Sequence, residues 1–133
     1  MFENRTLVLE QGARGTLVTF AIFTFNQEKY VSKAVEAAFA QTYEPMQIIL
    51  SDDCSSDRTL EILQKMARDY RGPKHVIVRQ SKRNCGTLRH VAEVAKLARG
   101  ELLVLASGDD ISKPQRTAAL VETWQTSGAW GLC

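Results

Sequence analysis

The stretch LVTFAIFTF, from Leu17 to Phe25, decides the fold class of this chain. Apolar and β-branched side chains fill almost every position, so both faces of the segment need cover from water. A strand that is buried on both faces is typical of a parallel sheet with helices on its two sides. The next segment, Glu28 to Gln41, repeats its apolar side chains at helical spacing, which predicts an amphipathic helix directly after the strand.

The same alternation of strand and helix continues along the chain. Apolar runs at 46–50, 75–79 and 101–106 predict three more strands, and helices are predicted at 57–70, 87–98 and 114–127. Alternation at this spacing predicts right-handed crossovers and a mainly parallel α/β sheet. Because the sequence has no internal repeat, low-complexity segment or linker, we expect one domain.

Composition excludes several classes of function. The 133 residues carry a formal charge of only +2, and the few aromatic residues do not alternate with basic clusters, so we expect no nucleic-acid partner. No apolar run approaches the roughly 20 residues that span a bilayer, which leaves only peripheral membrane association open. The three cysteines are sparse, which predicts a reducing, cytoplasmic location. Phosphate-loop and G-x-G-x-x-G motifs are missing, which argues against NTPases and classical dinucleotide binders.

The loops after the predicted strands hold most of the unusual polar residues. In open parallel sheets, ligands bind beyond the carboxyl ends of the strands. Asp52 and Asp53 follow the second strand, and Asp57 with one serine is enough to cap the next helix. The two remaining carboxylates could accept hydrogen bonds from a base or a ribose. The alternative is that the whole cluster only caps that helix and favours its dipole.

A second acidic loop, Ser107-Gly108-Asp109-Asp110, follows the fourth strand. Paired carboxylates suit a hard cation such as Mg²⁺ or Mn²⁺, because Mg²⁺ takes only one or two protein carboxylates and keeps other positions for water and phosphate. The alternative is an ordinary Gly-Asp turn, in which the aspartates bond locally.

Other polar residues near these loops have equally plain alternatives. Asn26 follows the first strand and could simply form an Asx-turn. Lys82, Arg83 and Arg89 could neutralise phosphate or could be solvated surface charge. His90 falls on a predicted helix, where packing is the simplest role.

Taken in order, these segments resemble the family 2 glycosyltransferases, which have the GT-A fold. The matching pieces are FTFN at 23–26, AQTY at 40–43, IILSDDCSSDRT at 48–59, NCG at 84–86, ARGE at 98–101, SGDDI at 107–111 and KP at 113–114. The resemblance implies a Rossmann-like three-layer sandwich, and we predict the strand order 3-2-1-4 with helices on both faces. The two acidic loops would then flank the first strand.

The resemblance also implies roles for single residues. The turn Thr24, Phe25 and Asn26 would line the nucleotide pocket, and Asp53 would contact the base. Asp109 would be the metal-binding aspartate of a D-x-D-like motif, with Asp110 beside it, and the implied cofactor is Mg²⁺ or Mn²⁺. The implied nucleotide-sugar-binding set is Thr24, Phe25, Asn26, Asp53, Arg89, Ser107, Gly108 and Asp109, where Arg89 faces the diphosphate.

Several positions depart from the family pattern. Ser107 stands where the motif often has its first aspartate, Cys54 where glycine often follows the paired aspartates, and His90 where asparagine is frequent. Family domains are also longer than this chain. We therefore expect a lead-in at 1–15, a donor-binding domain at 16–133, and an absent acceptor half that would hold the unknown catalytic base.

The expected function is sugar transfer from a nucleoside diphosphate sugar to an acceptor hydroxyl, assisted by metal and, by family, inverting. The acceptor would be a saccharide, a lipid-linked molecule or a protein, and the location the cytoplasm or the inner face of the membrane. Two alternatives are a non-catalytic nucleotide-binding module and a flavodoxin-like domain whose acidic loops only resemble the motif. We also expect self-association of the truncated form through a face with Val121, Trp124 and Trp130.

Overall fold

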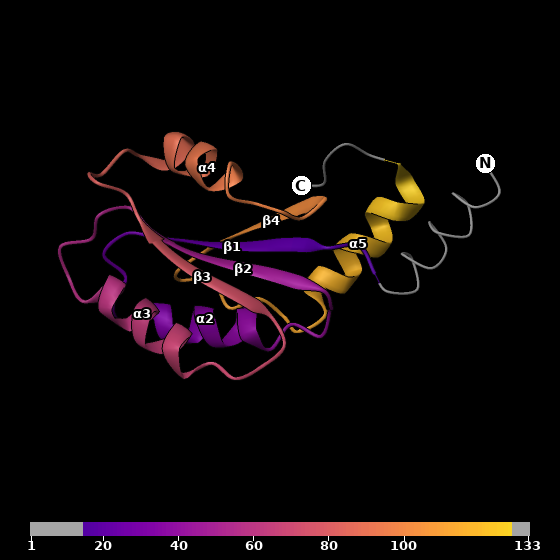
Figure 1. Cartoon of the computed structure of the whole chain (residues 1–133), viewed down its shortest axis with the longest axis horizontal. Helices are drawn as coiled ribbons and strands as arrows, with labels where there is room; N and C mark the ends of the chain where they lie inside the picture. Colours follow the sequence, from indigo (N-terminus) through magenta and orange to yellow (C-terminus); the bar gives the residue numbers. More distant parts are fainter. Residues whose placement is uncertain (1–14, 129–133) are drawn as a thin grey trace.

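The first apolar segment forms an inner strand of a four-stranded parallel sheet (Figure 1). The computed structural model describes residues 15–128. Its elements are β1 (Val18–Thr24), α2 (Val31–Phe39), β2 (Met46–Asp52), α3 (Thr59–Asp69), β3 (His75–Gln80), α4 (Thr87–Ala95), β4 (Leu102–Ser107) and α5 (Arg116–Ser127). The sheet order is β3-β2-β1-β4, so the predicted α/β class and the order 3-2-1-4 are confirmed.

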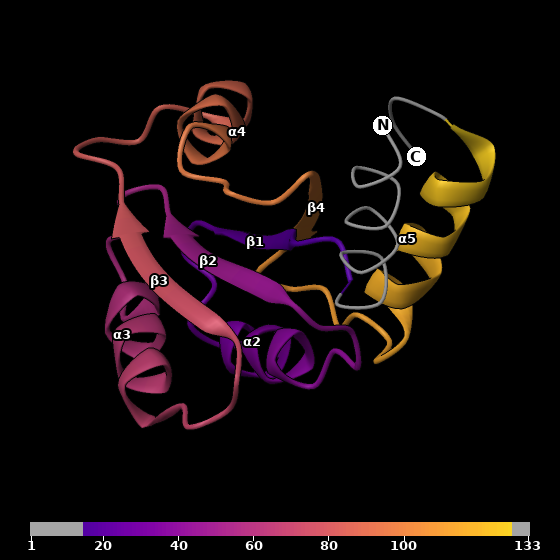
Figure 2. The same cartoon turned by 45° about the vertical axis from the view of Figure 1, so that its right-hand side comes forward.

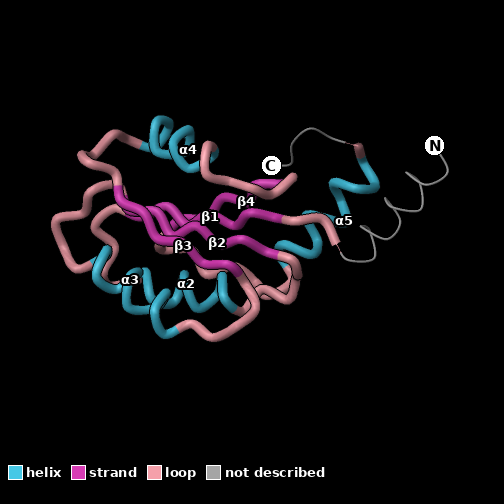
Figure 3. The backbone as a smooth tube through the Cα atoms, in the orientation of Figure 1, coloured by secondary structure: helices cyan, strands magenta, loops and turns pink. Residues whose placement is uncertain are grey.

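Helices cover both faces of the sheet, as Figure 3 shows, with α2 and α3 on one face and α4 on the other. The larger core cluster lies on the α2 and α3 side, where Phe20, Ile22 and Leu50 pack under Val35 and other helix residues. The smaller cluster lies under α4, where Val94 packs with Ala21 and Ile49 of the sheet. Burial on both faces explains the apolar runs at 20–23 in β1 and 48–50 in β2.

Helix α5 lies apart from the other three helices, at the side of the sheet (Figure 2). After β4 the chain runs back toward the end of α2, where the side chain of Gln41 fixes it. The Gln41 amide nitrogen donates to the carbonyl of Lys113 at 2.8 Å, and its oxygen accepts from the Thr117 N–H at 3.0 Å. A buried glutamine with these partners holds the start of α5 against α2.

The observed boundaries of one strand and two helices differ from the predicted ones. Strand β2 extends to Asp52, so Ser51 and Asp52 belong to the sheet and are fully buried. Helix α4 ends at Ala95 rather than near 98, and α5 begins at Arg116, two residues after Pro114. Since hydrophobicity marks burial only for apolar side chains, a strand that ends on hydrogen-bonded polar residues appears too short in the sequence.

The expectation for an exposed face on α5 is wrong for Val121, which is 5% exposed and belongs to the larger core cluster. Trp124 is partly exposed, while Trp130 lies outside the described residues, as does most of the expected lead-in at 1–15. Within residues 15–128 no helix has the length and apolar character needed to cross a bilayer.

Candidate nucleotide-sugar site

A pocket of about 610 Å³ opens where the carboxyl ends of β1 and β4 meet the start of α4. Its size falls within the usual range for small-molecule sites. The lining comes from four separate segments: Phe23, Thr24, Phe25 and Gln27; Asp53; Asn84, Gly86, Thr87, His90 and Val91; and Leu105, Ala106, Ser107 and Asp110. The crossovers of a parallel sheet bring these distant segments together at one edge.

Both acidic loops are tied to the end of β1, as the strand order requires. The N–H of Asp53 donates to the carbonyl of Thr24, and the N–H of Gly108 donates to the carbonyl of Phe23, each at 2.9 Å. The two loops therefore flank β1 at the pocket edge. What their carboxylates do there is different.

Asp52 is a structural residue. Its fully buried carboxylate accepts hydrogen bonds from the hydroxyl of Thr24 at 2.8 Å, the N–H and hydroxyl of Ser55, and the side-chain amide of Gln80 at 3.1 Å. These bonds join three strands and the loop after β2. Because its partners are all internal, Asp52 stabilises the edge of the sheet and does not line the pocket.

Asp53 lines the pocket and also fastens the loop before α4. Its carboxylate accepts from the N–H and thiol of Cys85, both at 3.1 Å, and from the N–H of Gly86 at 3.1 Å. Burial raises the pKa of Asp53, but these hydrogen bonds outweigh it and hold the pKa below its usual value. Asp53 is therefore ionised at neutral pH, with its carboxylate beside the pocket.

Asn26 does not line the pocket, because its side chain points to the loop after β2. Its amide oxygen accepts from the N–H of Ser56 at 2.8 Å, and its own N–H donates to the hydroxyl of Ser55. The residue has φ of 48°, a left-handed conformation that asparagine tolerates better than most residues. The structure thus gives Asn26 a turn-forming position, and the predicted nucleotide contact stays a prediction.

Asp57 lies one residue before Arg58, the N-cap of α3, and bonds the first residue of the helix without being the cap that the sequence suggested. Its carboxylate accepts from the N–H of Thr59 at 2.9 Å and from the same residue's hydroxyl. Burial raises the pKa of Asp57, but these bonds and the N–H of Glu28 more than offset it, so the pKa is lowered. With Asp57 and Asp52 used for structure, Asp53 is the carboxylate of this loop that faces the pocket.

The loop after β4 is held by its glycine. A Cβ on Gly108 would lie 2.5 Å from Oε1 of Gln27 and 2.7 Å from Cγ2 of Thr24, so only glycine lets the loop approach β1 this closely. Gly108 is buried and does not line the pocket, whereas its neighbour Ser107 does. The Gln27 amide also reaches the hydroxyl of Ser107 at 3.4 Å.

The carboxylates of this loop are unused. Asp109 and Asp110 are exposed, and neither has a hydrogen bond or ion pair with its side chain among the described residues. Asp110 lines both this pocket and a second one of about 590 Å³ beside the start of α5, while Asp109 lines neither. No cluster of three His, Cys, Asp or Glu side chains that could cage a metal exists within residues 15–128. Two adjacent free carboxylates fit a cation that is shared with a phosphate group.

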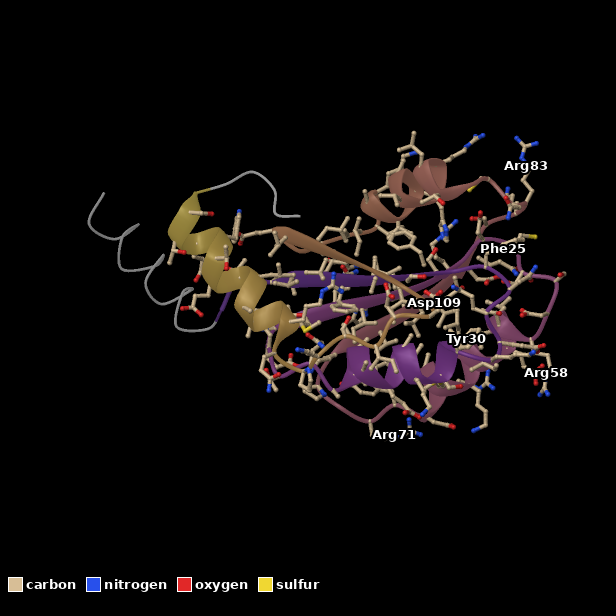
Figure 4. All side chains as sticks on the ribbon, turned by 180° about the vertical axis from the view of Figure 1, so that it is seen from behind. Phe25, Tyr30, Arg58, Arg71, Arg83 and Asp109 are labelled. Atoms are coloured by element: carbon tan, nitrogen blue, oxygen red, sulfur yellow. The ribbon has the colours of Figure 1, made fainter. Side chains whose placement is uncertain are left out.

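Phe25 lines the pocket, whereas the basic residues predicted to contact phosphate do not. Phe25 is 46% exposed and forms part of the pocket wall, and Figure 4 labels it toward the same end of the molecule as Arg83. Arg89 is exposed and does not line the pocket, and Lys82 is exposed as well. Their predicted contacts with phosphate stay predictions.

His90 is the pocket residue that sequence reasoning treated as simple packing. It is 3% exposed, its Nε2 contacts the hydroxyl of Ser51, and its ring packs edge-on against Phe23 at 4.9 Å between centroids. Burial lowers the pKa of His90, the charge of Asp53 opposes this, and Arg79 adds to the lowering, so His90 is neutral at neutral pH. The sign in the sequence that could have revealed this role is the place of His90, because it is a polar residue on the buried face of α4, next to the edge of the sheet where ligands bind.

The remaining residues of the pocket lining are explained by where the fold places them. Asn84 and Gly86 belong to the NCG segment of the family resemblance, while Gln27 and Thr87 belong to no motif that the sequence analysis singled out. Gly86 begins the turn into α4 with φ of 79°, which favours glycine. Only the tertiary structure distinguishes these residues from the other polar residues of the same loops.

Comparison with known proteins gives a consistent result. Residues 19–133 match the model of the family described as Glycosyl transferase family 2. An uncharacterized glycosyltransferase of Nostoc sp. is 29% identical over 118 residues, which cover 86% of this chain and 35% of that protein. The chain spans about a third or less of the length of the relatives that it matches.

Solved structures agree in fold. TarS of Staphylococcus aureus, in complex with UDP-GlcNAc, aligns with a TM-score of 0.68 and 25% identity over 81% of this chain and 32% of its own. The mannosyltransferase PcManGT of Pyrobaculum calidifontis, in complex with GDP-Man and Mn²⁺, aligns with a TM-score of 0.75 over 80% of this chain and 32% of its own. Its 17% identity makes this second likeness one of fold alone.

Proposed function

Since the chain belongs to glycosyl transferase family 2, we propose that its pocket binds the nucleoside diphosphate sugar from which a sugar is transferred to an acceptor hydroxyl. The family supports sugar transfer in general. The donor, the metal and the stereochemistry are the parts that this proposal adds.

One observation carries the proposal. Two acidic loops flank β1 at one edge of the sheet, and each contributes a carboxylate to the same pocket, Asp53 from one and Asp110 from the other. Asp53 is bonded on its protein side to Cys85 and Gly86 and borders the pocket, so it can accept one further hydrogen bond from a base. Asp110 borders the same pocket, and its carboxylate has no partner among residues 15–128. The pocket thus offers Asp53 to a base and Asp110 to a cation bound by the diphosphate.

The carboxylates of Asp109 and Asp110 would hold a divalent cation, Mg²⁺ or Mn²⁺, together with the diphosphate. A bound cation would stabilise the negative charge that develops on the leaving diphosphate. Without a cation, the negative diphosphate and the Asp110 carboxylate would repel each other at this short range. Arg89 and Lys82, exposed on α4 and the loop before it, would add long-range attraction for the diphosphate.

The reaction that we propose is a direct displacement, with the acceptor hydroxyl attacking the sugar carbon from the face opposite the diphosphate, which inverts the configuration. Acceptors of this class are saccharides, lipid-linked molecules or protein hydroxyls. The solved relatives have UDP-GlcNAc in TarS and GDP-Man in PcManGT, so nucleoside diphosphate sugars are the donors to test. Location in the cytoplasm, or at the inner face of a membrane, stays a prediction.

Calorimetric titration of the chain with UDP, with and without Mn²⁺, tests the proposal. We expect Mn²⁺ to tighten UDP binding, and the double change Asp109→Ala with Asp110→Ala to abolish that tightening. Metal-free binding should become no weaker in this variant, because the repulsion between the Asp110 carboxylate and the diphosphate is removed. Asp53→Asn should weaken binding equally with and without Mn²⁺, because its partner would be the base. The change Asp53→Asn should cost about tenfold in affinity, as the loss of one hydrogen bond to a charged group does.

The matched control is Glu122→Ala, which removes an exposed carboxylate from α5, away from the pocket. It should bind UDP as the parent does under both conditions. The proposal is wrong if the folded aspartate variants also bind like the parent, or if UDP does not bind. A non-catalytic nucleotide-binding module would pass this test but would transfer no sugar from a bound donor in the presence of acceptor.

A further inference from the structure

The side chain of His90 is the buried titratable group of the pocket for which the proposed function has no use. It projects from α4 to the sheet, where its Nε2 contacts the hydroxyl of Ser51. That hydroxyl also receives a hydrogen bond from Nη1 of Arg79 at 2.8 Å. Ser51 is fully buried, and these two are the partners of its oxygen among the described residues.

The partners of Ser51 determine which nitrogen of His90 carries the proton. Arg79 can only donate, so the single hydrogen of the Ser51 hydroxyl is left to point at Nε2 of His90. If Nε2 carried the proton, the hydroxyl would accept two hydrogen bonds and its own buried hydrogen would have no acceptor, which is unfavourable. Nε2 is therefore the acceptor, and in the neutral ring Nδ1 carries the hydrogen.

The Nδ1–H of His90 faces the pocket. This nitrogen has no partner among the described residues, and within them no fully buried side-chain nitrogen or oxygen lacks a partner. Nδ1 therefore retains contact with open space, and the space that His90 lines is the pocket. The ring cannot turn away easily, since Ser51 holds one edge and Phe23 packs against the ring at 85°.

Asp53 stands beside this donor. The N–H of His90 donates to the carbonyl of Gly86 at 3.0 Å, and the N–H of Gly86 donates to the Asp53 carboxylate at 3.1 Å. The backbone of His90 is thus one helical turn from the residue that holds Asp53, and both side chains line the same pocket. The charged groups that act on His90 are Asp53, Arg79 and Asp52, of which Asp53 also borders the pocket.

We propose that His90 is a specificity-determining residue for the base of the nucleotide, donating its Nδ1–H to a ring carbonyl while Asp53 accepts from the adjacent ring N–H. This inference rests on the proposed function. A neighbouring acceptor and donor complement a lactam edge, which uracil and guanine have. If cytosine or adenine bound in the same orientation, a ring nitrogen lone pair would face the Asp53 carboxylate and an amino group would face the Nδ1–H of His90. Sites that hydrogen-bond their ligand in this way reject such a mismatch strongly. Ser51 is a positioning residue, because it acts through His90.

The tautomer is tested first, in the free chain. The sequence has two histidines, so His75→Gln leaves His90 as the only imidazole for nitrogen NMR. We expect a protonated Nδ1 and an unprotonated Nε2 at neutral pH, and a shift of the Nδ1 signal when UDP is added with Mg²⁺. A protonated Nε2, a charged ring, or an Nδ1 signal that does not move with UDP overturns the inference.

Variants of His90 test the contact itself. His90→Asn places an amide nitrogen where Nδ1 lies, whereas His90→Phe keeps the ring packing and has no donor. We expect roughly five- to tenfold weaker UDP binding for His90→Phe, the range for one lost hydrogen bond, with CDP binding unchanged and UDP binding largely kept in His90→Asn. Ser51→Ala should weaken UDP binding less and shift the nitrogen signals toward a mixture of tautomers.

Each outcome separates this inference from the proposed function. If calorimetry shows UDP binding while the His90 nitrogen does not respond, the inference fails and the proposed function stands. If UDP does not bind at all, both fail. Equal weakening by His90→Asn and His90→Phe would show that the ring only packs, which also overturns the inference, and if His90→Phe does not fold, the NMR titration of the parent decides.

Discussion

The loops after β2 and β4 carry the same pair of residues, Asp52-Asp53 in one and Asp109-Asp110 in the other, and both are bonded to the end of β1. Their carboxylates are in opposite situations. Asp52 and Asp53 are buried and accept hydrogen bonds from neighbouring strands and loops, while Asp109 and Asp110 are exposed with no partner among the described residues. Asp52 has only internal partners, whereas Asp53 is held by Cys85 and Gly86 and also borders the pocket. Identical residues near the ends of two strands therefore have different surroundings, according to which donors the fold brings to them.

The largest expected difference is in stability. Asp52→Ala removes the acceptor for four hydrogen bonds inside the fold and should lower the free energy of unfolding by about 3 to 4 kcal/mol. The matched change Asp110→Ala should stay within about 0.5 kcal/mol, as for other partnerless surface residues. Urea denaturation of both variants measures this, and a similar loss in both would mean that the two pairs are not different after all.

A second prediction is that Gly108 is the residue of the loop after β4 on which the stability of the fold depends. Gly108→Ala would place a methyl group 2.5 Å from Gln27 and 2.7 Å from Thr24, so we expect a loss of about 1 to 3 kcal/mol from overpacking. Gly86→Ala is a useful comparison, because a Cβ there meets no atom within 4 Å and any cost comes from its φ of 79° alone. Thermal unfolding should show Gly108→Ala to be the more damaging change.

A third prediction concerns how the contribution of Asp53 to stability changes with pH. The folded pKa of Asp53 is lower than its usual value of 3.8, so its contribution is present above that pH and is lost as the pH falls through the folded pKa. Asp53→Asn should therefore be less stable than the parent at neutral pH, by about 1.5 kcal/mol, the lower end of the range for a lost hydrogen bond to a charged group, and this difference should shrink in acid. Denaturation at a series of pH values tests it; a difference that is constant with pH would assign the loss to packing.

The smallest expected change in stability concerns the turn after β2. Cys54 has φ of 63°, a conformation that costs a non-glycine residue about 1 kcal/mol and that glycine adopts freely. Since glycine also loses more chain entropy on folding, Cys54→Gly should stabilise the chain by only about 0.5 kcal/mol. Cys54→Ala keeps the strained backbone and is the control: if it stabilises as much, the thiol and not the backbone is responsible.

The carboxyl-edge site could be predicted from the sequence because strand and helix periodicities determine the sheet, and the sheet determines which loops meet. The individual roles in the site could not. Asp52 is the last residue of β2 and Asp53 the first residue after it, and different donors surround each of them, which their shared sequence context does not reveal. For Asn26 the sequence allowed a ligand contact or a turn, and only the structure shows that its amide oxygen accepts from the Ser56 N–H. His90 resembled a core residue and lines the pocket.

The sequence by itself determined the α/β class, the strand order through its family resemblance, and the two acidic loops at one edge, because these depend on local apolar periodicity and on motifs that lie within a few residues. Only the tertiary structure decided which carboxylates are free. Hydrogen-bond partners come from segments far apart in the chain, as when Gln80 and Thr24 meet at Asp52. A buried polar group must be paired, so a carboxylate becomes structural or available according to which donors the fold brings within reach.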